Sequence, residues 1–241
     1  MNLNKVILLV VSLIFLTAVV PAMVTSQEMA QDDWQFNAAI YLWGASIGGN
    51  TGSGSEIDVE FDDILDKLEI AFMGTFGMSK GKWSFLTDVI YLNVGKDKVA
   101  DSGIKLSADI TSWIVTPALG YNLADTEKFR LDILGGARYF YLKTELGLGS
   151  RNTDDSGSMW DGILGVKGSL NFGKHFYLPY YGDIGAGDSD FTWQAFGGIG
   201  FRFDRVDIEL AYRHLEYRFD DKLVVEKLNF SGPLAGIKFK F

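Results

Sequence analysis

Ile237-Lys238-Phe239-Lys240-Phe241 is the stretch that decides the fold, because its apolar residues alternate strictly with two lysines. Successive side chains of a β-strand point to opposite faces, so this pattern predicts a strand with one apolar and one charged face. An aromatic ring, that of Phe241, stands at its last position. The same period recurs along most of the chain upstream, which predicts an all-β protein.

About ten segments of this kind follow one another, and their apolar faces begin near Trp34, Leu68, Trp83, Trp113, Phe129, Trp160, Phe176, Phe191 and Val206, with the tenth ending at Phe241. The connections alternate in length. Those at 80–81, 124–128, 173–175 and 204–205 are short, whereas those at 44–67, 95–103 and 145–157 are longer or polar. Short turns at one end and longer loops at the other are typical of an up-and-down barrel that crosses a membrane. We therefore expect a closed antiparallel barrel of about ten strands, with eight or twelve as alternatives.

The N-terminus has the features of an export signal. Lys5 is the only charged residue among the first 26, the run from Val6 to Val20 is apolar apart from two hydroxyl residues, and small residues precede a cleavage point after Ser26. The apolar run is short for a membrane helix, which needs about 20 residues. We expect residues 1–26 to be a cleaved signal peptide and residues 27–241 to form one domain. An uncleaved anchor is the alternative.

Composition excludes some classes of function. The chain has no cysteine and a formal net charge of −9. Disulfides and thiolate chemistry are therefore excluded. An acidic chain without a basic run also argues against nucleic acid as a partner, since phosphates must be neutralised by clustered Lys or Arg.

Three features favour a membrane barrel, with apolar residues outside, over a soluble barrel with apolar residues inside. The first is the export signal, and the second is a set of glycines in mid-strand that would relieve crowding in a small barrel. The third is the grouping of aromatic residues into two belts, as expected at the two membrane interfaces. One belt lies beside the short turns and termini: Trp34, Trp83, Tyr121, Phe129, Phe172, Phe203 and Phe241. The other lies toward the longer loops: Trp43, Tyr91, Trp113, Tyr139, Tyr141 and Trp160.

Several motifs resemble a widespread group of exported proteins. They are Tyr41-Leu42-Trp43-Gly44, the stretch 61–68, Phe72-Met73-Gly74, Lys80-Gly81-Lys82-Trp83 and 88–92. The chain is similar to largely uncharacterised outer-membrane β-barrel proteins of Gram-negative bacteria, loosely akin to the OmpA/OmpW-like barrels. Tyr212-Arg213-His214-Leu215 resembles a late-strand motif of that group, which usually has a second aromatic where His214 stands. The resemblance implies an outer-membrane location but no catalytic residue. It also implies that Phe241 is a signal read by the barrel-assembly machinery.

The inward face of the predicted barrel carries acids and bases in nearly equal number: Glu69, Asp88, Asp132, Asp161, Asp183, Asp207 and Glu209 with Arg130, Arg138, Lys167, Arg202, Arg213 and Lys238. An interior of about ten strands is narrow, and an unpaired charge in a confined site is costly. We therefore expect these charges to pair across the bore and to close it. A gated path for ions or small solutes is the alternative.

Evidence for catalysis in the sequence is sparse. His175 falls in a short turn, where a solvated side chain is expected. His214 shares a face with Glu216, and the two could form a general base and its orienting carboxylate. No serine lies two residues away on that face, so we expect no catalytic residue; a lipid A- or phospholipid-modifying hydrolase is the alternative.

The loop at 44–67 carries clustered carboxylates at Glu56, Asp58, Glu60, Asp62, Asp63 and Asp66. Apolar residues recur at helical spacing over 62–68, which predicts a short amphipathic helix. The carboxylate spacing differs from an EF-hand, so we expect a solvated acidic loop, with calcium as the alternative ligand.

The sequence therefore predicts an integral outer-membrane barrel that is non-enzymatic, structural or surface-exposed, and has a charge-paired interior. Expected partners are membrane lipids, lipopolysaccharide and the assembly machinery. We expect no cofactor and no metal.

Overall fold

The computed structural model describes residues 33–99, 105–148, 151–220 and 225–241. The expected signal peptide, residues 1–26, lies outside the described residues, as do 100–104 in one expected loop and 221–224 before the last strand.

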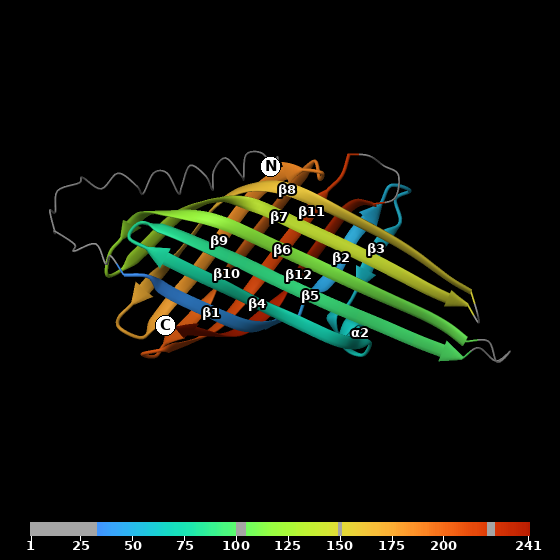
Figure 1. Cartoon of the computed structure of the whole chain (residues 1–241), viewed down its shortest axis with the longest axis horizontal. Helices are drawn as coiled ribbons and strands as arrows, with labels where there is room; N and C mark the ends of the chain where they lie inside the picture. Colours follow the sequence, from blue (N-terminus) through green and yellow to red (C-terminus); the bar gives the residue numbers. More distant parts are fainter. Residues whose placement is uncertain (1–32, 100–104, 149–150, 221–224) are drawn as a thin grey trace, which may run out of the picture. The chain divides into compact units, whose positions relative to one another are not determined.

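Ten antiparallel strands form one closed barrel (Figure 1). Each strand pairs with the next in the order of the chain, and β1 also pairs with β12, which closes the sheet. The strands are β1 (Gln35–Trp43), β4 (Leu68–Lys80), β5 (Trp83–Val99), β6 (Lys105–Asp125), β7 (Phe129–Leu148), β8 (Arg151–Phe172), β9 (Phe176–Gly187), β10 (Phe191–Arg202), β11 (Val206–Arg218) and β12 (Val225–Lys240). The predicted fold class and the preferred strand number are confirmed.

All four expected short turns lie at one end of the barrel, together with the start of β1 and the end of β12. We call this the near end. Gly81 and Gly173 occupy two of these turns with φ of 57° and 73°. A left-handed backbone of this kind is strained for residues with a side chain, so glycine lets the chain reverse within two or three residues.

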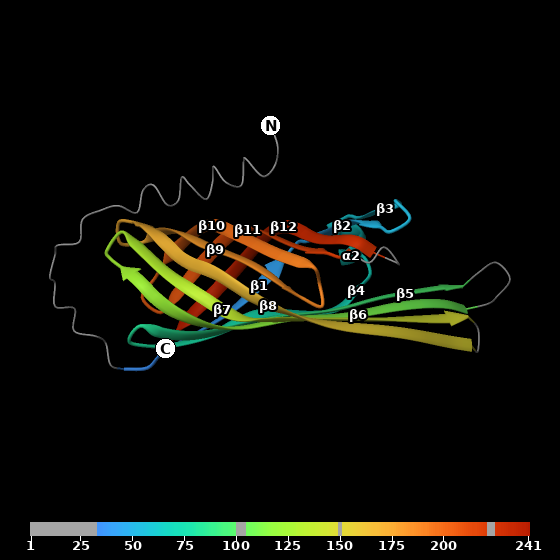
Figure 2. The ribbon, with the colours of Figure 1, turned by 90° about the horizontal axis from the view of Figure 1, so that it is seen from above.

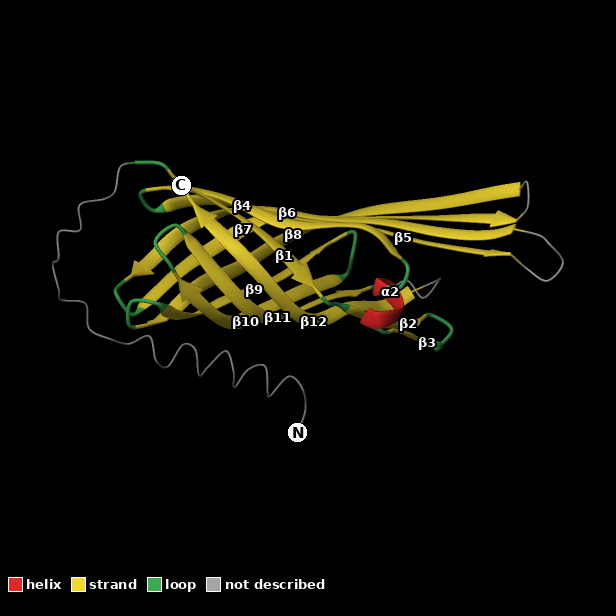
Figure 3. Cartoon of the chain, turned by 90° about the horizontal axis from the view of Figure 1, so that it is seen from below, coloured by secondary structure: helices red, strands yellow, loops and turns green. Residues whose placement is uncertain are grey.

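At the opposite, far end, the region expected to be one long loop contains regular structure. β2 (Ser46–Thr51) continues β1 in the same register against β12, since Trp43 pairs with Leu234 and Ser46 with Ser231. β2 then forms a hairpin with β3 (Glu56–Val59), and the helix α2 (Phe61–Leu65) leads into β4 (Figure 3). The short helix was predicted from apolar spacing, and it begins one residue earlier than expected. Among the described residues, no helix has the length and apolar composition that a membrane-spanning helix requires.

Four strands, β5 to β8, run far past their neighbours at the far end (Figures 2 and 3). Three of them, β6, β7 and β8, contain 21, 20 and 22 residues, whereas about 9–11 suffice to cross a bilayer. Where the structure describes them, the expected loops at 95–103 and 145–157 are strands instead, so that part of the prediction is wrong: pairing continues to Val99 with Lys105 and to Leu148 with Arg151. Apolar alternation marks a strand only where one face is buried, and beyond the barrel wall that constraint is lost.

Apolar side chains cover the outside of the barrel. Leu42, Leu164 and Leu210 are exposed by 73%, 69% and 58%, whereas inward Asp132 and Arg138 are exposed by at most 1%. This distribution is the reverse of that in a soluble protein and agrees with the predicted orientation. Cross-strand aromatic pairs mark both expected belts: Trp83 with Tyr121, Tyr91 with Trp113, and Tyr139 with Trp160.

Candidate functional site

The interior of the barrel changes character from the near end to the far end. Along β11, the inward positions are Asp207 and Glu209, then Arg213, then Leu215 and Tyr217. Because alternate residues of a strand share a face, this one strand samples the whole bore. It crosses a charged layer, a layer of buried ion pairs and an apolar layer.

The charged layer at the near end joins β11 to β12. Lys240 Nζ lies 2.8 Å from Asp207 Oδ1, and Lys238 Nζ lies 2.8 Å from Glu209 Oε1. Tyr177 of β9 donates a hydrogen bond of 2.6 Å from its hydroxyl to Glu209. Each carboxylate therefore has both a cation and a phenol as partner.

A second part of this layer surrounds Asp132 of β7, whose side chain is almost fully buried. Asn122 donates a 2.6 Å hydrogen bond to its Oδ1, and Arg130 Nε lies 3.4 Å from the same oxygen. Lys167 of β8 approaches Oδ2 at 3.9 Å. Arg202 lies apart from these carboxylates, with its guanidinium 4.7 Å from the Tyr177 ring centroid.

The middle of the bore holds a buried network around Arg213. Its Nη2 lies 2.7 Å from Asp88 Oδ2 of β5, and its Nη1 donates a 3.0 Å hydrogen bond to the hydroxyl of Tyr41 on β1. Tyr41 in turn donates to Asp88 at 2.6 Å, and Gln194 of β10 accepts from Arg213. The guanidinium also lies over the ring of Trp43 at 4.7 Å. One cation thus links four strands across the interior.

A second buried pair links β7 to β9. Arg138 of β7 contacts Asp183 of β9 at 2.5 Å and donates a 3.1 Å hydrogen bond to Thr192 Oγ1 of β10. Both charged side chains are fully inaccessible to solvent. Nearby Asp161 accepts a 2.9 Å hydrogen bond from the backbone N–H of Ser189.

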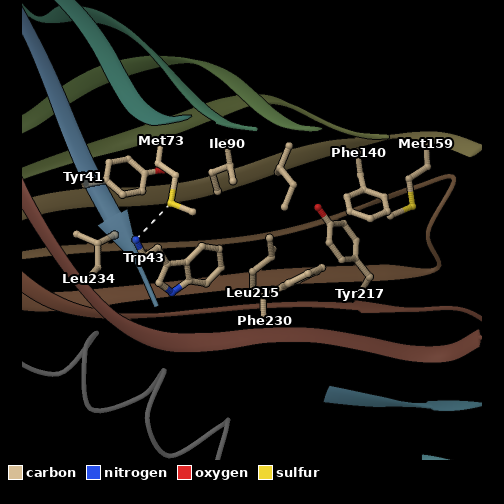
Figure 4. Packing of buried hydrophobic residues seen from close by; sticks show 11 residues of the cluster. Tyr41, Trp43, Met73, Ile90, Phe140, Met159, Leu215, Tyr217, Phe230 and Leu234 are labelled. Carbon is tan, nitrogen blue, oxygen red and sulfur yellow. Dashed lines mark hydrogen bonds between the residues drawn. The ribbon is translucent and has the colours of Figure 1, made fainter. Parts of the chain in front are cut away.

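An apolar layer lines the bore next to these pairs, mostly on their far-end side (Figure 4). It consists of Tyr41, Trp43, Met73, Ile90, Ile114, Phe140, Met159, Leu215, Tyr217, Phe230 and Leu234. Trp43 was expected in the outer aromatic belt, and that assignment is wrong: it is 3% exposed and packs inside, with its ring 6.4 Å from that of Phe230. The alternation that turns Ile40 and Leu42 outward necessarily turns Tyr41 and Trp43 inward.

Twelve of the expected interior charges are thus placed by the structure inside the barrel or at its near rim, and Glu69 is the exception. Its side chain is exposed, because the pairing of β4 with β5 shifts between Leu68 and Ile70 and takes Glu69 out of the regular alternation. The polar partners Tyr41, Tyr177 and Gln194 were not predicted from the sequence. The two-residue period of β1, β9 and β10 already places these three side chains on the inward face, so they could have been predicted.

The acidic residues of the far-end loop are exposed, and Asp62 and Asp63 occupy the first turn of α2. Across the described ranges, no three His, Asp or Glu side chains are arranged to hold a metal ion.

His214 points outward from β11, away from the bore. Its register partner on β12 is Ser231, and Ser231 Oγ lies 2.5 Å from His214 Nδ1. Glu216 Oε2 lies 3.7 Å from His214 Nε2. The serine that is missing from β11 itself is therefore supplied by the neighbouring strand.

Comparison with known proteins identifies no family model and no curated relative for this chain. Solved structures that resemble it are outer-membrane proteins. The protease OmpT from Escherichia coli is 9% identical, with 90% of this chain and 99% of that one covered and a TM-score of 0.47. Ail of Yersinia pestis, solved with a heparin analogue, is 13% identical over 86% and 98% of the two chains, with a TM-score of 0.42. An outer membrane channel from Pseudomonas putida F1 is 9% identical over 91% and 99%, with a TM-score of 0.44.

Proposed function

We propose that this protein is an outer-membrane barrel with a closed bore, a structural or surface protein that works from its outer wall and far rim and does not conduct solutes. The observation that carries the proposal is the sequence of two sealing layers in the interior. Buried ion pairs fill the middle, and an apolar layer lies directly beyond them.

The ion pairs close the bore because their partners come from different walls. Arg213 joins β11 to β5 and β1, and Arg138 joins β7 to β9. A solute passing through would have to separate these pairs, which leaves buried charges without partners. Breaking one such pair costs about 3–5 kcal/mol, so thermal opening is rare.

The apolar layer adds a barrier of a different kind. Phe140 and Tyr217 contact each other with ring centroids 5.5 Å apart, and Phe230 lies 6.3 Å from Phe140. Leu215 and Tyr217 have no solvent-accessible surface. A constriction lined by such side chains holds no water path for an ion to follow.

The proposed orientation places the near end in the periplasm and the far end outside the cell, as short turns and long extensions are arranged in membrane barrels. Lipid acyl chains and lipopolysaccharide would cover the apolar wall. The far parts of β5 to β8 would then project beyond the membrane as a surface-exposed sheet. Phe241, at the near end, would be the residue read by the assembly machinery.

Planar-bilayer recording tests the closed bore. We expect the folded protein to insert without steady openings in concentrated KCl. As a matched comparison, the double variant Phe140→Ala/Leu215→Ala removes two side chains from the apolar layer while keeping every ion pair, and should show small, brief openings. Large steady openings of the wild type would refute the proposal and favour the channel.

A further inference from the structure

A cluster of polar residues lies on the outer wall of the barrel, where lipid-facing side chains would otherwise be expected. It is formed by Ser231 on β12 with His214 and Glu216 on β11. The first two are direct partners in the antiparallel register, so their side chains leave the sheet on the same face. Glu216 follows two residues after His214 and shares that face.

The contacts run in the order of a nucleophile, a base and a carboxylate. Ser231 Oγ lies 2.5 Å from His214 Nδ1, within hydrogen-bond distance. His214 Nε2, on the opposite side of the ring, has no hydrogen-bond partner among the described residues and lies 3.7 Å from Glu216 Oε2. Serine donating to Nδ1 leaves the ring proton on Nε2, directed at the carboxylate. Catalytic contacts of this kind are often long without substrate and tighten when it binds.

Neighbouring side chains fix the two partners of the serine. The ring of Trp193 on β10 lies 4.5 Å from that of His214 and limits its rotation. Arg218 Nε and Lys227 Nζ contact Glu216 at 2.6 Å and 3.0 Å. The carboxylate side chain is only 4% exposed although it points outward, because these residues cover it. An ionised carboxylate is thus held beside the imidazole, as a catalytic triad requires.

The position of the cluster identifies the class of substrate. Below it on β11, the outward residues are apolar and exposed: Ile208 by 46%, Leu210 by 58% and Tyr212 by 57%. On β12, the outward column Ile237, Ala235 and Pro233 is likewise apolar up to Ser231. The wall therefore changes from apolar to polar at the level of Ser231 and His214. That boundary is where lipid acyl chains meet their headgroups, and it is where their ester bonds lie.

We propose that Ser231, His214 and Glu216 form a hydrolytic site that cleaves fatty acyl esters of membrane lipids. Ser231 Oγ attacks the ester carbonyl carbon and passes its proton to His214 Nδ1. The tetrahedral intermediate collapses, the alcohol leaves with that proton, and the acyl group remains on Ser231. Water, deprotonated by His214, then attacks the acyl-enzyme. The bond between the acyl carbon and Ser231 Oγ breaks, His214 returns the proton to Oγ, and the fatty acid is released. Glu216 stabilises the imidazolium in both steps.

The same face of β12 supplies groups for the negative charge that develops on the carbonyl oxygen. Asn229 is the next outward residue after Ser231 and pairs in register with Glu216. Lys227 follows on that face, with its ammonium above the cluster. An amide and a cation are thus placed on the headgroup side of the serine, where they could bind the oxyanion or a lipid phosphate. The site goes beyond the closed-bore function proposed above, because it uses only the outer wall.

The test uses the full barrel, refolded in detergent and then in lipid vesicles. A fluorophosphonate with an alkyl chain should label the wild type and leave Ser231→Ala unlabelled. Ser158→Ala, which removes an exposed serine on β8, three strands away from β11, should label like the wild type. His214→Ala should label at least about 100-fold more slowly, the usual contribution of a general base. Heat-modifiable migration in a gel confirms that each variant is folded.

Two product arms distinguish the lipid source. In the first arm, vesicles of phosphatidylethanolamine and phosphatidylglycerol yield lysophospholipid and free fatty acid if phospholipid is the substrate. In the second arm, lipopolysaccharide in mixed micelles yields free fatty acid and a lipid A with one acyl chain fewer if lipid A is the substrate. Product from either arm that disappears in Ser231→Ala supports the site. Absence of label and product from the folded wild type, or product that persists in Ser231→Ala, overturns it.

Discussion

Replacing Arg213 by methionine should destabilise the folded barrel strongly. The Arg213 side chain is 5% exposed, and its guanidinium is bound to Asp88 at 2.7 Å and also contacts Tyr41 and Gln194. Methionine fills a similar volume but leaves the Asp88 carboxylate buried, with the Tyr41 hydroxyl as its one remaining side-chain hydrogen-bond partner among the described residues. Removing one partner of a buried pair costs about 3–5 kcal/mol. With a urea slope of about 1–3 kcal/mol/M, the unfolding midpoint should fall by on the order of 2 M.

The assay is equilibrium urea unfolding of the barrel in lipid vesicles, followed by tryptophan fluorescence. The double variant Asp88→Leu/Arg213→Met removes both charges, so its free energy of unfolding should return to within about 1 kcal/mol of the wild type or exceed it. Lys143→Met breaks an exposed pair with Glu145 beyond the barrel wall and should leave the midpoint where it is.

Comparing these variants tests whether Arg213 stabilises the barrel through its charge. A single variant Arg213→Met that unfolds within about 0.5 kcal/mol of the wild type would refute the reasoning, because a buried carboxylate without its cation cannot be that harmless. A double variant as unstable as the single one would show that Arg213 acts through packing on Trp43 rather than through its charge.

Three further outcomes are expected. Gly198→Ala should lower the free energy of unfolding, measured in urea, by about 1–3 kcal/mol, because the added Cβ would lie 2.2 Å from the Leu210 carbonyl oxygen. Gly197→Ala is the control: its Cβ would meet no atom within 4 Å, so the same measurement should give a value near the wild type. Deletion of Phe241 should lower the outer-membrane yield without changing synthesis, as measured by membrane fractionation and immunoblotting; normal assembly would contradict its role. The purified protein should aggregate when detergent is removed, and a monodisperse peak in plain buffer by light scattering would contradict the apolar exterior.

The face on which a residue lies was largely predictable from the sequence, because a strand has a strict period of two. That period placed Ile40 and Leu42 on one face, and the export signal, the mid-strand glycines and the aromatic belts identified this apolar face as the outer one. The assignment of Trp43 was wrong because its residue type was given more weight than this period. Trp43 was grouped with the interface aromatics by residue type, although its phase on β1 places it inside with Tyr41.

The apolar layer was missed for a related reason. The prediction described the interior by its charged residues alone, because charges on an inward face are conspicuous and aliphatic residues there are not. Ile90 and Leu215 have the same inward phase as Asp88 and Arg213, two residues earlier in each strand. Counting the inward positions without regard to polarity would have shown that the bore changes from charged to apolar along its length.

Register, unlike phase, could not be obtained from one strand at a time. His214 and Ser231 are 17 residues apart and become partners only because β11 and β12 are joined in a particular alignment. A shift of the pairing by two residues would keep every side chain on its proper face and would still separate the serine from the histidine. The alignment is fixed elsewhere, by partly buried contacts such as Lys238 with Glu209 and by the continuation of β1 into β2 along β12. The polar cluster on the outer wall is therefore a consequence of how the interior packs, and its chemistry can be tested independently of whether the bore is closed.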